Sequence, residues 1–116
     1  MSFYTQLKQE IKEKRKNDTI SKNNLIQLEQ AIFKDLPKQC RRCGSEDSLT
    51  LDHIVPRDLL RSFGVDVDRE IVEGNYHILC YRCNSFKGNR LDFIYPETKE
   101  ILINLLEKIC TQQKNK

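Results

Sequence analysis

Two Cys-x-x-Cys pairs constrain this chain more than any other feature of its sequence. They are Cys40–Cys43 and Cys80–Cys83, and 36 residues separate them. Each pair lets two thiolates reach one ion from a tight turn, and two pairs complete the tetrahedral four-thiolate shell that Zn²⁺ prefers. Such a closed shell has no open coordination position, so we expect the ion to stabilise the fold and not to catalyse. The long gap predicts a further structural unit between the pairs.

Other uses of paired cysteines agree less well with the sequence. Structural disulfides need an oxidising compartment, and nothing in the sequence indicates one. A redox-active Cys-x-x-Cys needs a single pair beside a βαβ pattern, which is absent. The chain has 116 residues, of which 38% are hydrophobic and 8% aromatic, so its core is small and a bound metal would add stability. The fifth cysteine, Cys110, lies in an amphipathic stretch, where we expect it to fill the core.

The charge of the chain is nearly balanced, with 20 basic and 17 acidic residues and a formal net charge of +3. This weak basic excess permits nucleic-acid binding but does not argue for it alone. Residues 51–75 hold six acidic residues against three arginines, whereas residues 76–116 hold seven basic residues against four acidic ones. An acidic segment beside a basic one suits cation ligands next to phosphate contacts, although ordinary mixing of surface charge gives the same pattern.

The sequence indicates neither a membrane span nor a secretory signal. No apolar run approaches the ~18 residues that cross a bilayer. The first residues also lack the apolar core of a signal peptide. We therefore expect a cytoplasmic protein that does not bind a membrane, in agreement with reduced, metal-binding cysteines.

Hydrophobic spacing and turn residues predict an α+β fold with helices at both ends. The expected elements are helices over 3–16 and 22–35 with a break at 17–19, a strand over 48–51, a loop or short helix over 57–72, a strand over 75–80, a short helix from 84 to about 88, and a helix over 97–112. Ser21 is expected to cap the second helix, and Pro37 follows its end. This pattern divides the chain into an N-terminal helical arm (1–36), a zinc-stapled core (37–92), and a C-terminal helix and tail (93–116).

Three polar motifs lie in or beside the segment between the cysteine pairs. They are Leu51-Asp52-His53-Ile54-Val55-Pro56, Gly74-Asn75-Tyr76-His77-Ile78-Leu79 and Asn84-Ser85-Phe86-Lys87-Gly88. Each motif alone is weak. An Asp-His pair is more often a hydrogen-bonded structural pair, and an asparagine before a strand or at a helix start is usually a turn or cap residue.

Together, in this order and at this spacing, the motifs resemble the HNH endonucleases, also called ββα-metal nucleases. The resemblance covers about residues 40–90, from the first cysteine pair through Asp-His-Ile-x-Pro to Cys-x-x-Cys-Asn-x-x-Lys-Gly. It implies a two-stranded hairpin packed on a helix, with one catalytic divalent ion between them. The two helices before Cys40 and the helix after Pro96 lie outside the resemblance.

The resemblance also implies roles in the hydrolysis of DNA phosphodiester bonds. His53 matches the general base, a task that neutral imidazole suits near pH 7. Asp52 and Asn84 match the ligands of the catalytic ion, and their oxygen atoms suit Mg²⁺ or Mn²⁺. Asn75 matches the residue that holds the loop and orients the base. Because neighbours in a regular strand point to opposite faces, we expect a bend that lets Asp52 and His53 serve one site.

The remaining candidate residues are nucleic-acid contacts. Lys87, one turn after Asn84, is expected to contact the phosphate. Four arginines in or near the cysteine pairs are expected either to follow a nucleic-acid backbone or simply to be solvated, namely Arg41, Arg42, Arg82 and Arg90. We expect His77 to be a structural or surface residue, and Tyr76 and Phe86 to belong to the core.

These features favour a small metal-dependent endonuclease that nicks double-stranded DNA as a monomer and cuts both strands as a dimer or in two encounters. The last residue of the HNH motif is Asn84 in this sequence, whereas many family members carry histidine there. We therefore expect a preference for Mg²⁺ or Mn²⁺ over softer ions. Family members carry a glycine-rich segment before the middle asparagine of the motif, whereas Gly74 alone represents it before Asn75 in this sequence. Two other classes stay open: a non-catalytic zinc-bearing nucleic-acid-binding module, and a helper subunit whose helices dock on a larger DNA-processing complex.

Overall fold

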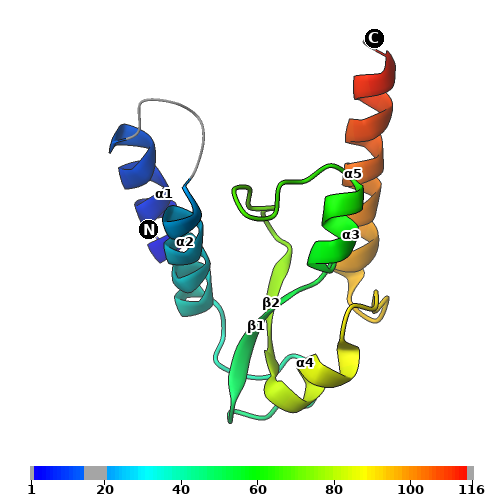
Figure 1. Cartoon of the computed structure of the whole chain (residues 1–116). Coiled ribbons are helices and arrows are strands. Elements are labelled where there is room, and N and C mark those ends of the chain that lie inside the picture. The colour runs from blue at the N-terminus through cyan, green and yellow to red at the C-terminus, as the bar shows by residue number, and fades with distance from the viewer. Residues whose placement is uncertain (1, 15–20, 115–116) are drawn as a thin grey trace.

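The computed structural model describes residues 2–14 and 21–114, which form five helices and two strands. In chain order these are α1 (Phe3–Lys14), α2 (Lys22–Asp35), β1 (Leu49–His53), α3 (Arg57–Ser62), β2 (Tyr76–Cys80), α4 (Tyr81–Lys87) and α5 (Pro96–Lys114). Figure 1 shows the β1–β2 hairpin at the centre, with α1 and α2 on one side, α3 and α5 on the other, and α4 at its lower end. The α+β fold expected from the sequence is confirmed.

The two strands form an antiparallel hairpin in which Asp52 pairs with His77 and His53 pairs with Tyr76. Directly paired residues share a face of the sheet, and successive residues alternate between faces. One face therefore carries the side chains of Thr50, Asp52, His77 and Leu79, and the other carries those of Leu51, His53, Tyr76 and Ile78. The first face contacts α4, where Asn84 bonds Thr50, and the second contacts α2, where Glu29 bonds Tyr76.

The N-terminal arm is a pair of packed helices whose ends are capped by side chains. Ser21 caps α2, as expected, because its hydroxyl accepts the backbone N–H of Asn24 at 3.1 Å. The carboxylate of Asp35 accepts the backbone N–H groups of Tyr4 and Phe3 at the start of α1, and these bonds hold the pKa of Asp35 below its ordinary value. The break expected at residues 17–19 lies outside the described residues.

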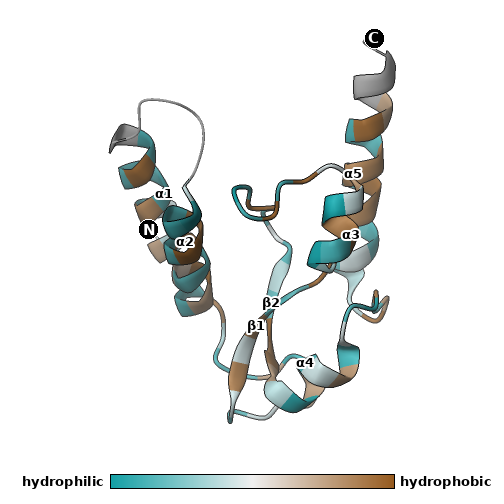
Figure 2. Ribbon diagram, viewed as in Figure 1, coloured by the Kyte–Doolittle hydropathy of each residue, from teal (hydrophilic) through white to brown (hydrophobic). Residues whose placement is uncertain are grey.

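Two buried clusters hold the rest of the described chain together. The larger joins the segment after β1 to α3 and α5 through Ile54, Val55, Leu60, Val67, Ile101 and Leu105. The smaller consists of Cys40, Leu79, Cys80 and Tyr95. Figure 2 shows hydrophobic residues along α5 beyond its contact with α3, and Ile103 and Leu106 there are exposed. Among the described residues, none of the helices is both long and apolar enough to cross a bilayer.

Three expectations about local structure need correction. The helix expected from residue 84 begins at Tyr81, because the sulfur of Cys80 accepts the backbone N–H of Cys83 and caps α4 directly at the end of β2. Phe86 is 66% exposed and does not belong to the core, and its ring instead lies beside Arg42 and Arg90. Cys110 is also exposed and fills no core, because the last buried residue recorded along α5 is Leu105.

Candidate metal centre and active site

Four cysteine sulfurs meet where the loop before β1 approaches the end of β2. The ligand atoms of Cys40, Cys43, Cys80 and Cys83 all lie within 4.8 Å of one another. The first pair sits in a tight turn that is closed by the Gly44 N–H bonding the Cys40 carbonyl, and the Arg41 N–H anchors the turn to Ile78 of β2. This arrangement matches the four-thiolate cluster expected from the sequence and is suited to a structural metal ion such as zinc.

Backbone amides prepare this cluster for metal binding. Burial acts to raise the pKa of the Cys40 thiol, but the backbone N–H groups of Cys43, Cys80 and Arg42 outweigh it and lower the pKa to about 6. Burial and the neighbouring sulfurs raise the pKa of Cys83 to about 12. Since thiolates are the metal-binding form and repel one another, a divalent cation is what allows all four to be deprotonated together.

Asp52 lies at the centre of a buried polar network between the hairpin and α4. Its side chain is nearly covered, with Asp52 only 7% exposed. The Oδ2 atom of Asp52 lies 2.7 Å from Nε2 of His77 and 3.1 Å from Nζ of Lys87. Lys87 also donates a hydrogen bond of 2.9 Å to the carbonyl of His53. The network therefore ties β1, β2 and α4 together through paired charges.

This network places two residues more deeply than the sequence indicated. His77 is buried, and its ring meets Tyr95 edge-on at 4.6 Å between centroids. Lys87 was expected to contact a phosphate, but it is 3% exposed and directed at Asp52. A lysine in this position contacts the Asp52 carboxylate instead of meeting solvent.

We expect Lys87→Met to lower the free energy of unfolding by about 3 kcal/mol, because among the described residues it leaves the buried Asp52 carboxylate paired with His77 alone. Methionine keeps most of the side-chain volume, so an unfilled cavity contributes little to the loss of stability. Urea or thermal denaturation measures the loss. Lys99→Met, at an exposed lysine of α5, is the matched control and should change stability by less than about 0.5 kcal/mol. Equal stability of the two variants contradicts the network.

His53 ends β1 on the opposite face from Asp52. Its Nε2 atom lies 3.3 Å from Oε2 of Glu29 in α2, and its ring lies 4.9 Å from the ring of Tyr76. The bend expected between Asp52 and His53 is absent, because pairing in the hairpin continues through His53 and Tyr76. The chain leaves the sheet only after His53, at Ile54.

Asn75 fixes the backbone that follows His53. It is 0% exposed, and its side chain accepts the N–H of Val55 at 2.7 Å and donates to the carbonyl of Val55 at 3.1 Å. Its own carbonyl accepts the N–H of Ile54. The preceding Gly74 has φ of +82°, a conformation that glycine adopts without strain. These contacts hold the turn after β1 in one position.

Asn84 projects from α4 toward the same face of the hairpin as Asp52. Its Nδ2 donates to the hydroxyl of Thr50 at 2.8 Å, and Thr50 donates in turn to the carbonyl of Leu79. Within the described chain, no hydrogen bond is recorded to Oδ1 of Asn84 or to Oδ1 of Asp52. This leaves two hard oxygen donors between β1 and α4, a donor set that fits Mg²⁺ or Mn²⁺.

The four candidate arginines lie near the cysteine cluster with different partners. Arg41 pairs with Glu97 and lies 4.8 Å above the Tyr95 ring. Arg42 pairs with Asp92 at 2.9 Å. Arg42 and Arg90 both lie over the ring of Phe86, at 5.6 and 5.0 Å. Arg82 is exposed at the start of α4. The structure thus places Arg41 over the buried ring of Tyr95, and Arg42 and Arg90 over the exposed ring of Phe86.

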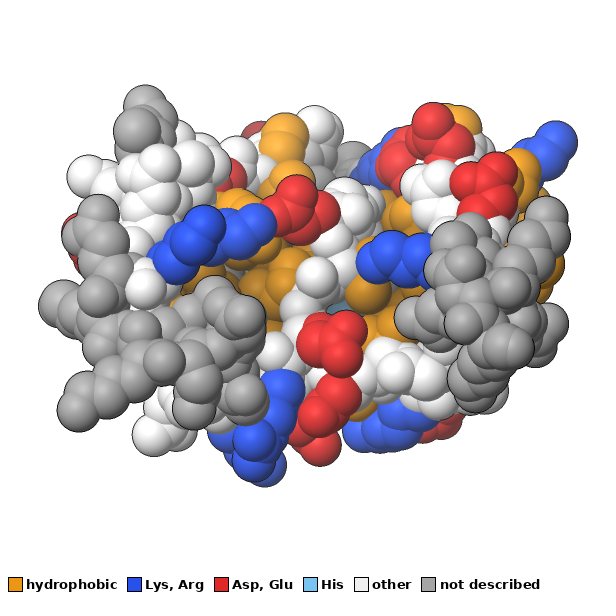
Figure 3. All heavy atoms as spheres, turned by 90° about the horizontal axis from the view of Figure 1, so that it is seen from above, with side chains coloured by type: hydrophobic (Ala, Val, Ile, Leu, Met, Phe, Trp, Pro, Cys, Tyr) orange, Lys and Arg blue, Asp and Glu red, His pale blue; other side chains and the backbone are white. Residues whose placement is uncertain are grey.

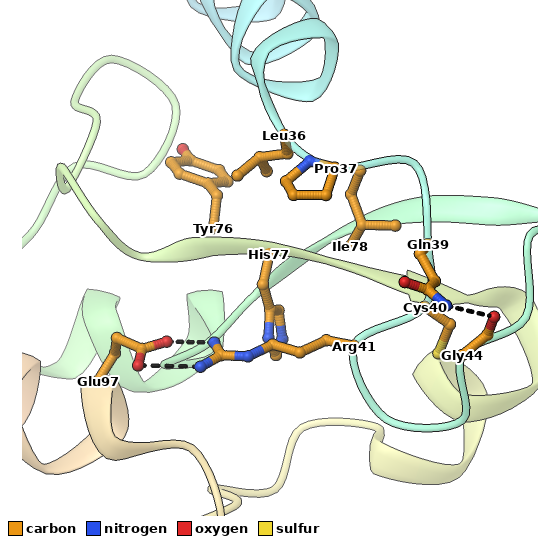
Figure 4. Close-up of a pocket in the computed structure, with 10 residues that line it drawn as sticks. All are labelled: Leu36, Pro37, Gln39, Cys40, Arg41, Gly44, Tyr76, His77, Ile78 and Glu97. Carbon is orange, nitrogen blue, oxygen red and sulfur yellow. Dashed lines mark hydrogen bonds and ion pairs between the residues drawn. The ribbon is translucent and has the colours of Figure 1, made fainter.

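A cavity of about 600 Å³ lies between the segment 36–44 and β2. Figure 4 shows Tyr76 and Ile78 directed toward Leu36 and Pro37, whereas His77 points to the other side of β2. The cavity is lined by Cys40 of the sulfur cluster but by neither Asp52 nor Asn84, the two candidate ligands of the catalytic ion. Figure 3 shows a histidine side chain at the floor of a depression between the two helical sides of the molecule, with charged side chains around it.

Sequence reasoning missed Glu29 as a partner of His53. The missing information is the packing of α2 on the hairpin, which no local motif encodes. A weak signal exists, because Glu29 lies four residues after Leu25 and three before Ile32 and so shares the inward face of the helix.

Comparison with known proteins points to one family. The family model described as HNH endonuclease matches residues 40–90, a range that contains both cysteine pairs, β1, α3, β2 and α4. No curated protein and no solved structure matches the chain.

Proposed function

Because residues 40–90 match the HNH endonuclease model, we propose that this protein hydrolyses phosphodiester bonds of double-stranded DNA, with His53 as the general base. The observation that carries the proposal is the pair of oxygen donors from Asp52 and Asn84 on one face of the hairpin, with His53 at the end of the same strand. Within the chain, we propose a helical arm at 1–36, a nuclease core at 37–92 and a C-terminal helix and tail at 93–116.

Asp52 and Asn84 would hold the catalytic divalent ion, whose chemistry is to stabilise negative charge on the scissile phosphate and on the leaving oxygen. Lys87 and His77 bond Oδ2 of Asp52, which leaves Oδ1 for this purpose. Four cysteines would hold a separate zinc ion with a structural role.

His53 would take a proton from the attacking water at an imidazole nitrogen. Asn75 supports this role by clamping Ile54 and Val55, the two residues that follow His53. Since Asp52 and His53 face opposite sides of β1, the scissile phosphate would have to lie across the end of this strand to meet both side chains. Arg41, Arg42, Arg82 and Arg90 are proposed contacts to the DNA backbone.

Relaxation of supercoiled plasmid tests this function. We expect purified protein to produce open circles with added Mg²⁺ or Mn²⁺ and none with EDTA, because one active site cuts one strand. Linear product at high protein concentration would indicate two encounters or a dimer. DNA binding without cleavage under any divalent ion contradicts the proposal and favours a binding module. Activity with Ni²⁺ or Zn²⁺ far above that with Mg²⁺ contradicts the proposed donor chemistry of Asp52 and Asn84.

A further inference from the structure

Glu29 reaches the end of β1 from outside the HNH domain. It lies in α2, before the first residue of the family match, and its side chain is 25% exposed. A single oxygen, Oε2, lies 3.3 Å from Nε2 of His53 and accepts the hydroxyl of Tyr76 at 3.0 Å. The N-terminal arm therefore supplies a carboxylate to the residue proposed as general base.

The surroundings of Glu29 keep this carboxylate charged. Burial acts to raise the pKa of Glu29, but the contacts from His53 and Tyr76 outweigh it and leave the pKa below its ordinary value. The hydroxyl of Tyr76 stays protonated, because burial and the Glu29 charge raise its pKa. Tyr76 thus remains a hydrogen-bond donor that fixes Oε2 while its ring packs against the imidazole of His53.

We propose that Glu29 is a positioning residue for His53, so that the N-terminal arm completes the nuclease active site. This inference rests on the proposed role of His53. If the neutral imidazole carries its proton on Nε2, the nitrogen that lies 3.3 Å from Glu29, the lone pair lies on Nδ1, which would then accept the proton of the attacking water. As the water oxygen bonds to phosphorus, the P–O bond to the leaving oxygen breaks, and the carboxylate stabilises the imidazolium that forms.

The first experiment compares Glu29→Gln and Glu29→Ala with wild type in metal-dependent cleavage of DNA. Gln keeps the size of the side chain but removes its charge. We expect kcat to fall about 10- to 100-fold in both variants with KM little changed, because the contact acts on proton transfer and not on DNA binding. Tyr76→Phe, which removes only the hydroxyl, should reduce kcat by less. Gln30→Ala, at an exposed neighbour on α2, is the matched control and should be fully active.

The second experiment records the imidazole ¹⁵N signals of His53 in the intact wild-type protein by long-range ¹H–¹⁵N NMR, so that it does not depend on whether a variant folds. The proposal expects the tautomer with the proton on Nε2. In Glu29→Ala, the signals should shift toward a mixture of the two tautomers. A wild-type His53 with its proton on Nδ1 overturns the proposal.

The outcomes separate this inference from the function on which it rests. If His53→Ala is inactive and both Glu29 variants retain wild-type kcat, the inference fails and the nuclease proposal stands. If His53→Ala cleaves as well as wild type, both fail. Higher activity in Glu29→Ala also overturns the inference, because it would mean that Glu29 blocks the imidazole.

Discussion

Cys80→Ser is expected to unfold residues 40–90, the part of the chain that matches the HNH endonuclease model. Cys80 contributes one of the four clustered sulfurs, caps α4 through the N–H of Cys83, and packs in the buried cluster with Leu79 and Tyr95. Metal binding to a four-thiolate site is worth roughly 10 kcal/mol or more in small zinc domains, which is comparable to the whole stability of a small protein. We therefore expect the cooperative thermal transition to disappear in circular dichroism.

Cys110→Ser provides the matched control, because Cys110 is exposed on α5 and lies outside the cluster. This variant should keep the melting temperature and one bound zinc per chain, measured by mass spectrometry of the metal. Removing zinc from wild type with a chelator should reproduce the Cys80→Ser spectrum, and added zinc should reverse it. A Cys80→Ser protein with unchanged melting and unchanged zinc content contradicts a four-thiolate structural site.

His53→Ala is expected to abolish DNA cleavage while the fold and the zinc content survive. Removal of a general base costs typically 10²- to 10⁴-fold in rate, which places the variant at or below the detection limit of a plasmid assay. The fold should persist because His53 ends its strand and is partly exposed, and the buried network of Asp52 uses only its carbonyl.

The assay follows open-circle formation with Mg²⁺ or Mn²⁺, with melting temperature and zinc content recorded for the same samples. Asn104→Ala, at an exposed residue of α5, controls for handling and should match wild type. Loss of zinc or of the thermal transition in His53→Ala would mean that His53 is needed for the fold. Unchanged cleavage would mean that His53 has no role in the reaction.

The sequence predicted the helices, the strands and the cysteine cluster because each depends on patterns within a few residues, such as hydrophobic spacing or a Cys-x-x-Cys pair. Cysteine spacing alone indicates which side chains converge, and Ser21 and Pro37 mark the limits of α2. Asn75 was singled out by its motif, although the bonds that it makes to Val55 depend on the hairpin register.

The contacts that the sequence could not predict join segments far apart in the chain. Glu29 and His53 meet because α2 packs on one face of the hairpin, and single-sequence periodicity gives no such pairing. Lys87 is buried, contrary to the usual preference of lysine for solvent, because Asp52 compensates its charge. Phe86 and Cys110 were misplaced because apolar residues in helices do not all face a core in so small a protein.

The seven residues of α4 carry a cysteine of the sulfur cluster, the amide of Asn84 and the buried ammonium of Lys87 within five positions. If a metal ion bound by the four cysteines dissociates, we expect the cap of α4 at Cys80 to weaken. The side chains of Cys83, Asn84 and Lys87 would then be displaced together. Loss of the metal would then disturb the fold and the proposed ligand Asn84 together, because both depend on the same short helix.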